Sequence, residues 1–208
     1  MRLKTILTKI HFISGIVLTA FIGLHFFNHF FSIIGPEKHL EIMKLLRPIY
    51  RNSISETLLF LAILLQLCTG SKLRKANQNT QSTPFELIQH WSGIYLAYFL
   101  FIHVVAVLIG RYFLKLDTNF YFGAAGLNSF PANLFFIPYY SLGILSFFAH
   151  LAAIHNKKMK VHLVGLSPAH QAKIILFFGM VVTLLLLCGF TNQFNGLDLP
   201  AAYSIFMG

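Results

Sequence analysis

Five apolar stretches, each long enough to cross the hydrocarbon layer of a bilayer, constrain the fold of this chain more than any other feature. They cover residues 10–34, 53–70, 88–110, 131–153 and 173–194. A helix needs about 20 apolar residues to span about 30 Å of hydrocarbon. Of the 208 residues, 56% are hydrophobic and 11% are charged, a composition that is not typical of soluble domains. We therefore expect an all-α, polytopic membrane protein whose five transmembrane helices form a single domain, residues 1–208.

The basic residues are divided unevenly between the two ends of these spans. Ten of the sixteen Lys and Arg precede the first span or lie in the loops after the second and the fourth; six lie at the other end. The positive-inside rule assigns the more basic end to the cytoplasm. We expect the N-terminus in the cytoplasm and the C-terminus outside. The net charge of +10 then orients the chain and does not indicate a nucleic-acid partner.

The first span carries three histidines, His11, His25 and His29, in a run that is otherwise mostly apolar. At about 100° per residue, His25 lies roughly 40° from the direction of His11 and His29 returns to it, so the three share one face. Their separation along the axis places His11 and His25 in opposite leaflets. Imidazoles at membrane depth mark a pathway or a ligand site, and the leading role is axial ligation of haem iron. The alternative is an interhelical hydrogen bond.

Histidines in the third and fourth spans complete two layers. Chain direction places His25, His29 and His103 in an outer layer, and His11, His90 and His150 in an inner layer. Two stacked six-coordinate b-type haems would need such an arrangement, each held by imidazoles from two helices. In the outer layer the expected ligands are His25 with His103, or His29 in place of His25. In the inner layer His150, His90 and His11 compete for two positions, and His90 points about 140° away from His103, which favours an interfacial place for it.

The segments between the spans carry further expectations. Residues 37–46 predict a short amphipathic helix at the outer interface, stopped by Pro48. Residues 117–131 predict an outer lid that rests on protein and roofs a cofactor or quinone cavity, or else an aromatic belt. Glu56 is expected to stabilise a helix N-terminus or to relay protons. The histidines expected to be solvated, in loops or at helix ends, are His39, His155, His162 and His170.

The order of several short motifs resembles one family. They are Thr8-Lys9-Ile10-His11 with Gly15, His25-Phe26-Phe27-Asn28-His29-Phe30, Gln89-His90-Trp91-Ser92-Gly93 before His103, Gly143-Ile144-Leu145 before His150, and Ser167-Pro168. Together they resemble the single-chain, five-helix, di-haem cytochrome b anchor of succinate dehydrogenases and fumarate reductases. The resemblance spans nearly the whole chain.

The resemblance implies a subunit that passes electrons between membrane quinone and a soluble dehydrogenase through haem b. Its partners would be an iron–sulfur subunit and a flavoprotein subunit on the cytoplasmic face, and its place the plasma membrane of a prokaryote. It implies that His25 and His103 hold one haem and that His150 is a ligand of the other. The family's ligand on the second helix falls on Gln66, and Gln is a poor haem ligand. The inner haem is therefore absent, held by His150 alone, or completed by His11 or His90.

Two other interpretations remain open from the sequence. In the first, a divergent stand-alone or differently partnered membrane protein uses the histidines to bind a metal, or to bind haem transiently during transport or cofactor handling. In the second, every histidine serves only as an interhelical hydrogen-bonding group. The two cysteines, Cys68 and Cys188, lack the spacing of a metal site or a haem-attachment motif, so the chain itself is not expected to hold an iron–sulfur centre.

Overall fold

The computed structural model describes residues 2–76 and 83–206, which form helices joined by loops. Five of the helices are long and apolar enough to cross a membrane. They are α1 (Arg2–Phe30), α3 (Ser53–Ala76), α4 (Pro84–Leu108), α6 (Asn133–Lys158) and α7 (Pro168–Phe190). The prediction of an all-α chain with five such helices is confirmed.

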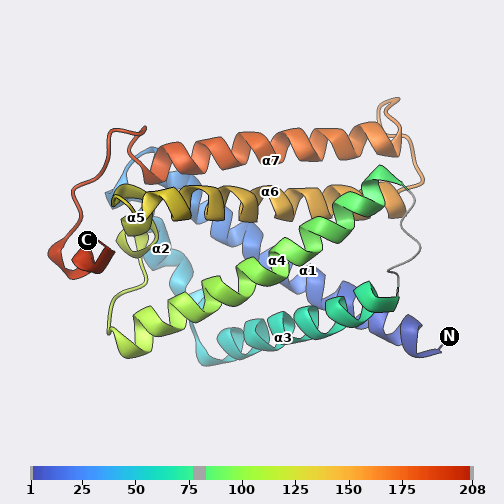
Figure 1. The fold of residues 1–208 in the computed structure, drawn as a ribbon, viewed down its shortest axis with the longest axis horizontal. Coiled ribbons are helices and arrows are strands. Elements are labelled where there is room, and N and C mark those ends of the chain that lie inside the picture. Colours follow the sequence, from blue (N-terminus) through green and yellow to red (C-terminus); the bar gives the residue numbers. More distant parts are fainter. Residues whose placement is uncertain (1, 77–82, 207–208) are drawn as a thin grey trace.

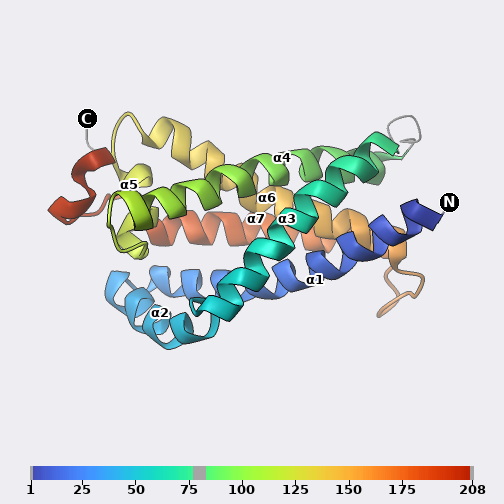
Figure 2. The ribbon, with the colours of Figure 1, turned by 90° about the horizontal axis from the view of Figure 1, so that it is seen from below.

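The long helices run along one axis, with the N-terminus at one end and the C-terminus at the other (Figure 1). α1 packs mainly on α3, whereas α6 packs on both α4 and α7. A second view shows α3 crossing the bundle obliquely (Figure 2). The two groups are joined by smaller contacts between α1 and α7 and between α3 and α4. The histidines of α1 and those of α4 and α6 therefore belong to two separate packing groups of one bundle.

The helix ends differ from the ends of the predicted spans. A helix can continue beyond the hydrocarbon layer wherever its backbone hydrogen bonds are made. α1 begins at Arg2, well before residue 10. α7 begins at Pro168, and the side chain of Ser167 accepts a hydrogen bond from the backbone N–H of His170, the N-cap that the Ser-Pro pair predicts. α7 ends at Phe190, four residues before residue 194, because residues 192–194 adopt positive φ angles of 49°, 55° and 66°.

A short helix, α2 (Pro36–Tyr50), connects α1 to α3 at the C-terminal end of the bundle. The prediction that it stops at Pro48 is wrong, because Pro48 lies inside its last turn. A proline there frees a backbone carbonyl group earlier in the helix, and its own carbonyl accepts a hydrogen bond of 2.9 Å from the side chain of Asn52. The helix therefore ends only at Tyr50.

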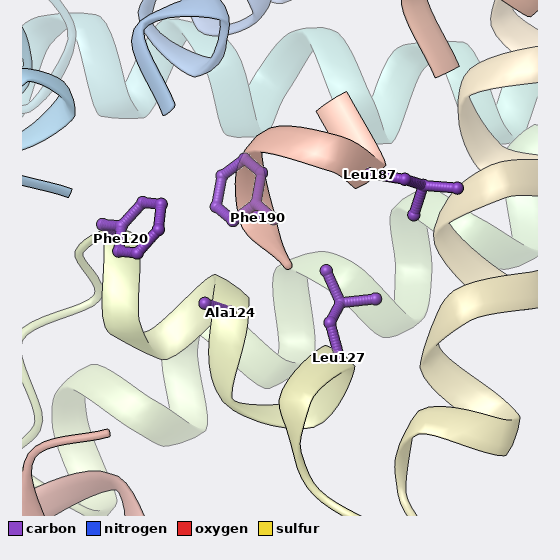
Figure 3. Close-up of a cluster of buried hydrophobic side chains, with 5 residues drawn as sticks. All are labelled: Phe120, Ala124, Leu127, Leu187 and Phe190. Carbon is purple, nitrogen blue, oxygen red and sulfur yellow. The ribbon is translucent and has the colours of Figure 1, made fainter. Parts of the chain in front are cut away.

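The segment predicted to form a lid contains a second short α-helix, α5 (Phe120–Asn128). The side chain of Asn119 caps its first turn. Phe120, Ala124 and Leu127 of α5 pack against Leu187 and Phe190 of α7 in a buried apolar cluster (Figure 3). The lid rests on protein, as the cost of exposing irregular backbone to lipid predicts.

Candidate functional site

The imidazoles of His25 on α1 and His103 on α4 lie next to each other between the two packing groups. Their ring centroids are 6.3 Å apart and their planes are inclined by 72°. Each ring stacks on a phenylalanine one turn earlier in its own helix, His25 on Phe21 at 5.7 Å and His103 on Phe99 at 5.3 Å. Stacking on both sides restricts the orientation of the pair.

The separation of this pair is compatible with ligation of one haem iron by both imidazoles. Metal–imidazole bonds of about 2 Å on opposite sides of one iron place the two ring centres roughly 6 Å apart. The observed separation of 6.3 Å agrees with that value. The two nitrogen donors also come from two helices that make their main interfaces with other helices, α1 with α3 and α4 with α6.

His29, the third histidine of the outer layer, contacts His25 and His39. Its Nε2 lies 3.0 Å from Nε2 of His25, and its Nδ1 lies 2.9 Å from Nε2 of His39. The structure therefore places His25 beside His103 and His29 between His25 and His39. Iron binding at Nε2 of His25 would replace the His25–His29 hydrogen bond, whereas the His29–His39 bond would remain.

The expectation that His39 is solvated is wrong. Its side chain is only 1% exposed, and its ring packs edge-on against Phe120 of α5 and Phe190 of α7. The cause is that α2 folds back along α1, and α5 then covers it. A signal was present in the sequence, because His39 lies four residues before Met43 on the apolar face of the predicted amphipathic helix, and both are buried.

Burial determines the charge state of His39. Loss of hydration lowers the pKa of His39 to about 4, so the ring is neutral near pH 7. Its Nε2 also lies 3.2 Å from the side-chain nitrogen of Asn28. Nδ1 of His39, Oδ1 of Asn28 and Oγ of Ser32 are buried and have no hydrogen-bond partner in the described part of the chain.

The inner layer places His11 of α1 against α3. Nδ1 of His11 lies 3.0 Å from the hydroxyl of Thr69, and its Nε2 lies 3.3 Å from the side-chain amide nitrogen of Gln66. Oε1 of Gln66 accepts a hydrogen bond of 2.6 Å from Ser14. Gln66, which stands at the family's ligand position, therefore belongs to a hydrogen-bonded network with His11.

His150 of α6 is held by α4 in the same manner. Its Nδ1 lies 3.2 Å from the hydroxyl of Ser92. Glycines follow the two hydroxyl residues: a Cβ on Gly70 would lie 3.2 Å from Cε1 of His11, and a Cβ on Gly93 would lie 3.3 Å from Cε1 of His150. Each inner imidazole thus contacts a hydroxyl residue and the glycine that follows it on the neighbouring helix. We call such a hydroxyl–glycine pair, Thr69–Gly70 for His11 and Ser92–Gly93 for His150, a cradle.

These cradles match the pattern of histidines that bind a metal through Nε2 while Nδ1 is fixed by a hydrogen bond. A metal at Nε2 of His11 would require the amide of Gln66 to move away from it. His90 lies beside Trp91, whose side chain is 67% exposed, so the predicted interfacial place suits it.

Gly143 is not part of a ring cradle of this kind. A Cβ at Gly143 would lie 2.6 Å from the ring of Phe99, the residue that stacks on His103. The glycine therefore permits close packing of α6 on α4.

Sequence reasoning missed an ion-pair cluster at the C-terminal end of the bundle. Arg111 pairs with Glu56, which ties the end of α4 to the start of α3. Arg47 and Arg51 at the end of α2 both pair with Asp117. Burial alone would raise the pKa of Asp117, but the hydrogen bonds and charges of Arg47 and Arg51 outweigh it and lower the pKa. No local pattern signals these pairs, because they join residues more than fifty positions apart.

No family model, no curated protein and no solved structure matches the chain. Within residues 2–76 and 83–206, no group of three or more His, Cys, Asp or Glu side chains is arranged to hold a metal ion. A haem with two imidazole ligands takes only two protein ligands, so a search for groups of three or more does not test such a site.

Proposed function

We propose that the chain is a membrane cytochrome b that carries electrons through haem held by His25 and His103. The observation that supports this proposal is the 6.3 Å separation of two stacked imidazoles from α1 and α4. The same residues are the outer ligands that the resemblance to the succinate dehydrogenase and fumarate reductase anchors implies. Haem b, when bound, supplies a carrier that accepts and releases one electron.

The residues of the chain would bind, orient and shield that carrier. His25 and His103 would supply neutral nitrogen donors, and Phe21 and Phe99 would restrict rotation of the two rings. Ligation by both His25 and His103 would favour electron transfer by the haem over binding of oxygen or water. The apolar helices around the pair would exclude solvent.

The inner layer supports a second haem in the same proposal. His150 would be one ligand, and His11 the other in place of the family's histidine at Gln66. The matching hydroxyl–glycine cradles of these two imidazoles favour His11 over His90. One haem in each layer would connect the two ends of the bundle.

The distribution of charge supports the remaining parts of the proposal. The basic N-terminal end would face the cytoplasm, where an iron–sulfur subunit and a flavoprotein subunit would dock. The five long apolar helices would cross the plasma membrane of a prokaryote, and quinone dissolved in that membrane would be the second redox partner. The chain would take part in catalysis only as a subunit of such a quinone oxidoreductase.

The test is the number of haems per chain in histidine variants purified from cells supplied with haem. His25→Ala and His103→Ala are each expected to remove one haem, and His162→Ala, which changes an exposed histidine, is expected to remove none. His150→Ala measures the inner site independently. A folded wild-type chain that binds no haem, or haem content that is unchanged in both outer variants, would overturn the proposal.

A further inference from the structure

A hairpin between α6 and α7 presents apolar side chains at the basic end of the bundle. Leu163 and Leu166 form an isolated antiparallel bridge, and the backbone N–H of Leu166 donates to the carbonyl of Leu163 at 2.9 Å. The tip residue, Val164, is 99% exposed, and Val161 and Leu163 are 59% and 47% exposed. We name residues 159–167 the α6–α7 hairpin.

The hairpin is fixed to the helices that it connects. The side-chain nitrogen of Gln171, on α7, donates to the backbone carbonyls of Val161 at 3.1 Å and of Leu166 at 2.8 Å. Oε1 of Gln171 lies 2.8 Å from Nε2 of His155, on α6. Gln171 is 7% exposed, so these bonds are protected from water. The apolar tip is therefore held in one position by buried hydrogen bonds.

The backbone at the tip disfavours the residue that stands there. Val164 and Gly165 have φ angles of 50° and 75°. Asn or Gly is the usual first residue of a turn with two left-handed positions, and a β-branched residue there is strained. Valine is thus unfavourable for the turn, and its exposure to water is also unfavourable. Contact of the tip with an apolar phase would remove the second cost.

The hairpin extends sideways from the bundle. In both Figure 1 and Figure 2 the orange segment between α6 and α7 leaves the ends of these helices at an angle to the long axis. It therefore lies beside the end of the bundle. Two exposed lysines lie on its α6 side, Lys157 just before the hairpin and Lys160 at its start.

We propose that the α6–α7 hairpin lies in the lipid–water interface of the leaflet at the N-terminal end. Val164 and Leu163 would contact the boundary between headgroups and acyl chains, and the flanking lysines would contact anionic headgroups. The sideways direction favours lipid over a soluble partner, which would bind beyond the helix ends. This inference goes beyond the proposed electron transfer and does not depend on haem.

A single tryptophan at the tip tests the proposal. Trp91 is the only tryptophan in the chain, so Trp91→Phe with Val164→Trp gives one fluorescent probe. In vesicles that contain anionic lipid, shallow brominated acyl chains are expected to reduce its emission at least about twofold relative to unbrominated lipid. Aqueous iodide is expected to quench the emission of this probe only weakly in vesicles. It should quench the probe more strongly after the protein is transferred to detergent and the hairpin is released by proteolysis.

The control is a probe at Lys160, made by Lys160→Trp in the same Trp91→Phe background. Because Lys160 precedes the apolar tip, its probe is expected to show less quenching by brominated lipid than the probe at Val164. If brominated lipid leaves the Val164→Trp probe unquenched, or quenches both probes equally, the proposal is wrong. A tip that binds a soluble protein instead of lipid would leave the Val164→Trp probe unquenched by brominated lipid in vesicles of the purified chain.

Discussion

At the scale of single residues, burial decides what each histidine of this chain can do. His39 and His162 both lie outside the predicted spans, yet His39 is enclosed by α2, α5 and α7 while His162 is exposed on the α6–α7 hairpin. Enclosure keeps His39 neutral and bonded to His29. Sequence position alone does not separate these two cases, because the contacts that enclose His39 come from residues 120 and 190.

The low pKa of His39 predicts loss of stability in acid. The folded pKa is about 4, whereas an unfolded histidine has a pKa of about 6.5, so the unfolded state binds more protons between these values. The free energy of unfolding should therefore fall as pH drops from about 6.5 to about 4, by up to about 3 kcal/mol. His39→Gln, which keeps hydrogen-bonding groups but does not titrate, is expected to reduce this pH dependence. Thermal unfolding followed by circular dichroism measures it.

The matched control for this prediction is His162→Gln. Because His162 is exposed, its replacement is expected to leave the dependence of unfolding on pH as in the wild type. Equal pH dependence in His39→Gln and in the wild type would show that His39 is protonated freely in the folded chain.

The inner cradles predict a second effect at this scale. Thr69→Val removes the hydroxyl that fixes Nδ1 of His11 and conserves side-chain shape. Removing such a support lowers metal-site affinity about 10-fold to 100-fold, so haem should dissociate more readily from the inner site. Transfer of haem to apomyoglobin would measure the dissociation rate.

The control is Ser71→Ala on the same helix, because the hydroxyl of Ser71 bonds only the carbonyl of Cys68 in the described structure. Its haem should dissociate at the wild-type rate. Equal rates for Thr69→Val and the wild type would contradict the assignment of His11 as an inner ligand.

At the scale of helices, close contacts at glycines determine how α7 meets the end of α1. A Cβ on Gly189 of α7 would lie within 2.9 Å of the backbone nitrogen of Ile33 and 3.0 Å of the carbonyl carbon of Ser32. Both atoms belong to the backbone of the short helix η1 (Phe31–Ile33), which follows α1. Backbone atoms cannot rotate away as a side chain can, so the contact fixes the distance between these elements.

Gly189→Ala is therefore expected to destabilise the chain by about 1–3 kcal/mol through overpacking. Gly23→Ala is the control within α1, since a Cβ there has nothing within 4 Å. The control should be neutral, or stabilising through the higher helix propensity of alanine. Unfolding in a denaturing detergent, followed by circular dichroism, compares the two. An equal loss of stability in both variants would show that the contact does not constrain the fold.

At the scale of the whole molecule, the five long helices follow from the sequence because hydrophobic length is a local property. The pairing of His25 with His103 agrees with the depth that chain direction predicts. The spacing of His39 from Met43 indicates the apolar face of α2. The burial of that face and the pairing of Arg47 with Asp117 did not follow, since both depend on how α2 folds back. The sequence marks Gln66 as a departure from the pattern that the chain resembles, but its bonds to His11 and Ser14 depend on the packing of α1 on α3.

The proposed electron transfer requires two imidazoles that hold one iron within the bundle. Resonance Raman spectroscopy of the purified chain tests this, because it reports the coordination number and spin state of haem iron. We expect six-coordinate, low-spin haem in both oxidation states. A correctly folded chain without haem, or haem that is five-coordinate and high-spin in both states, would contradict it.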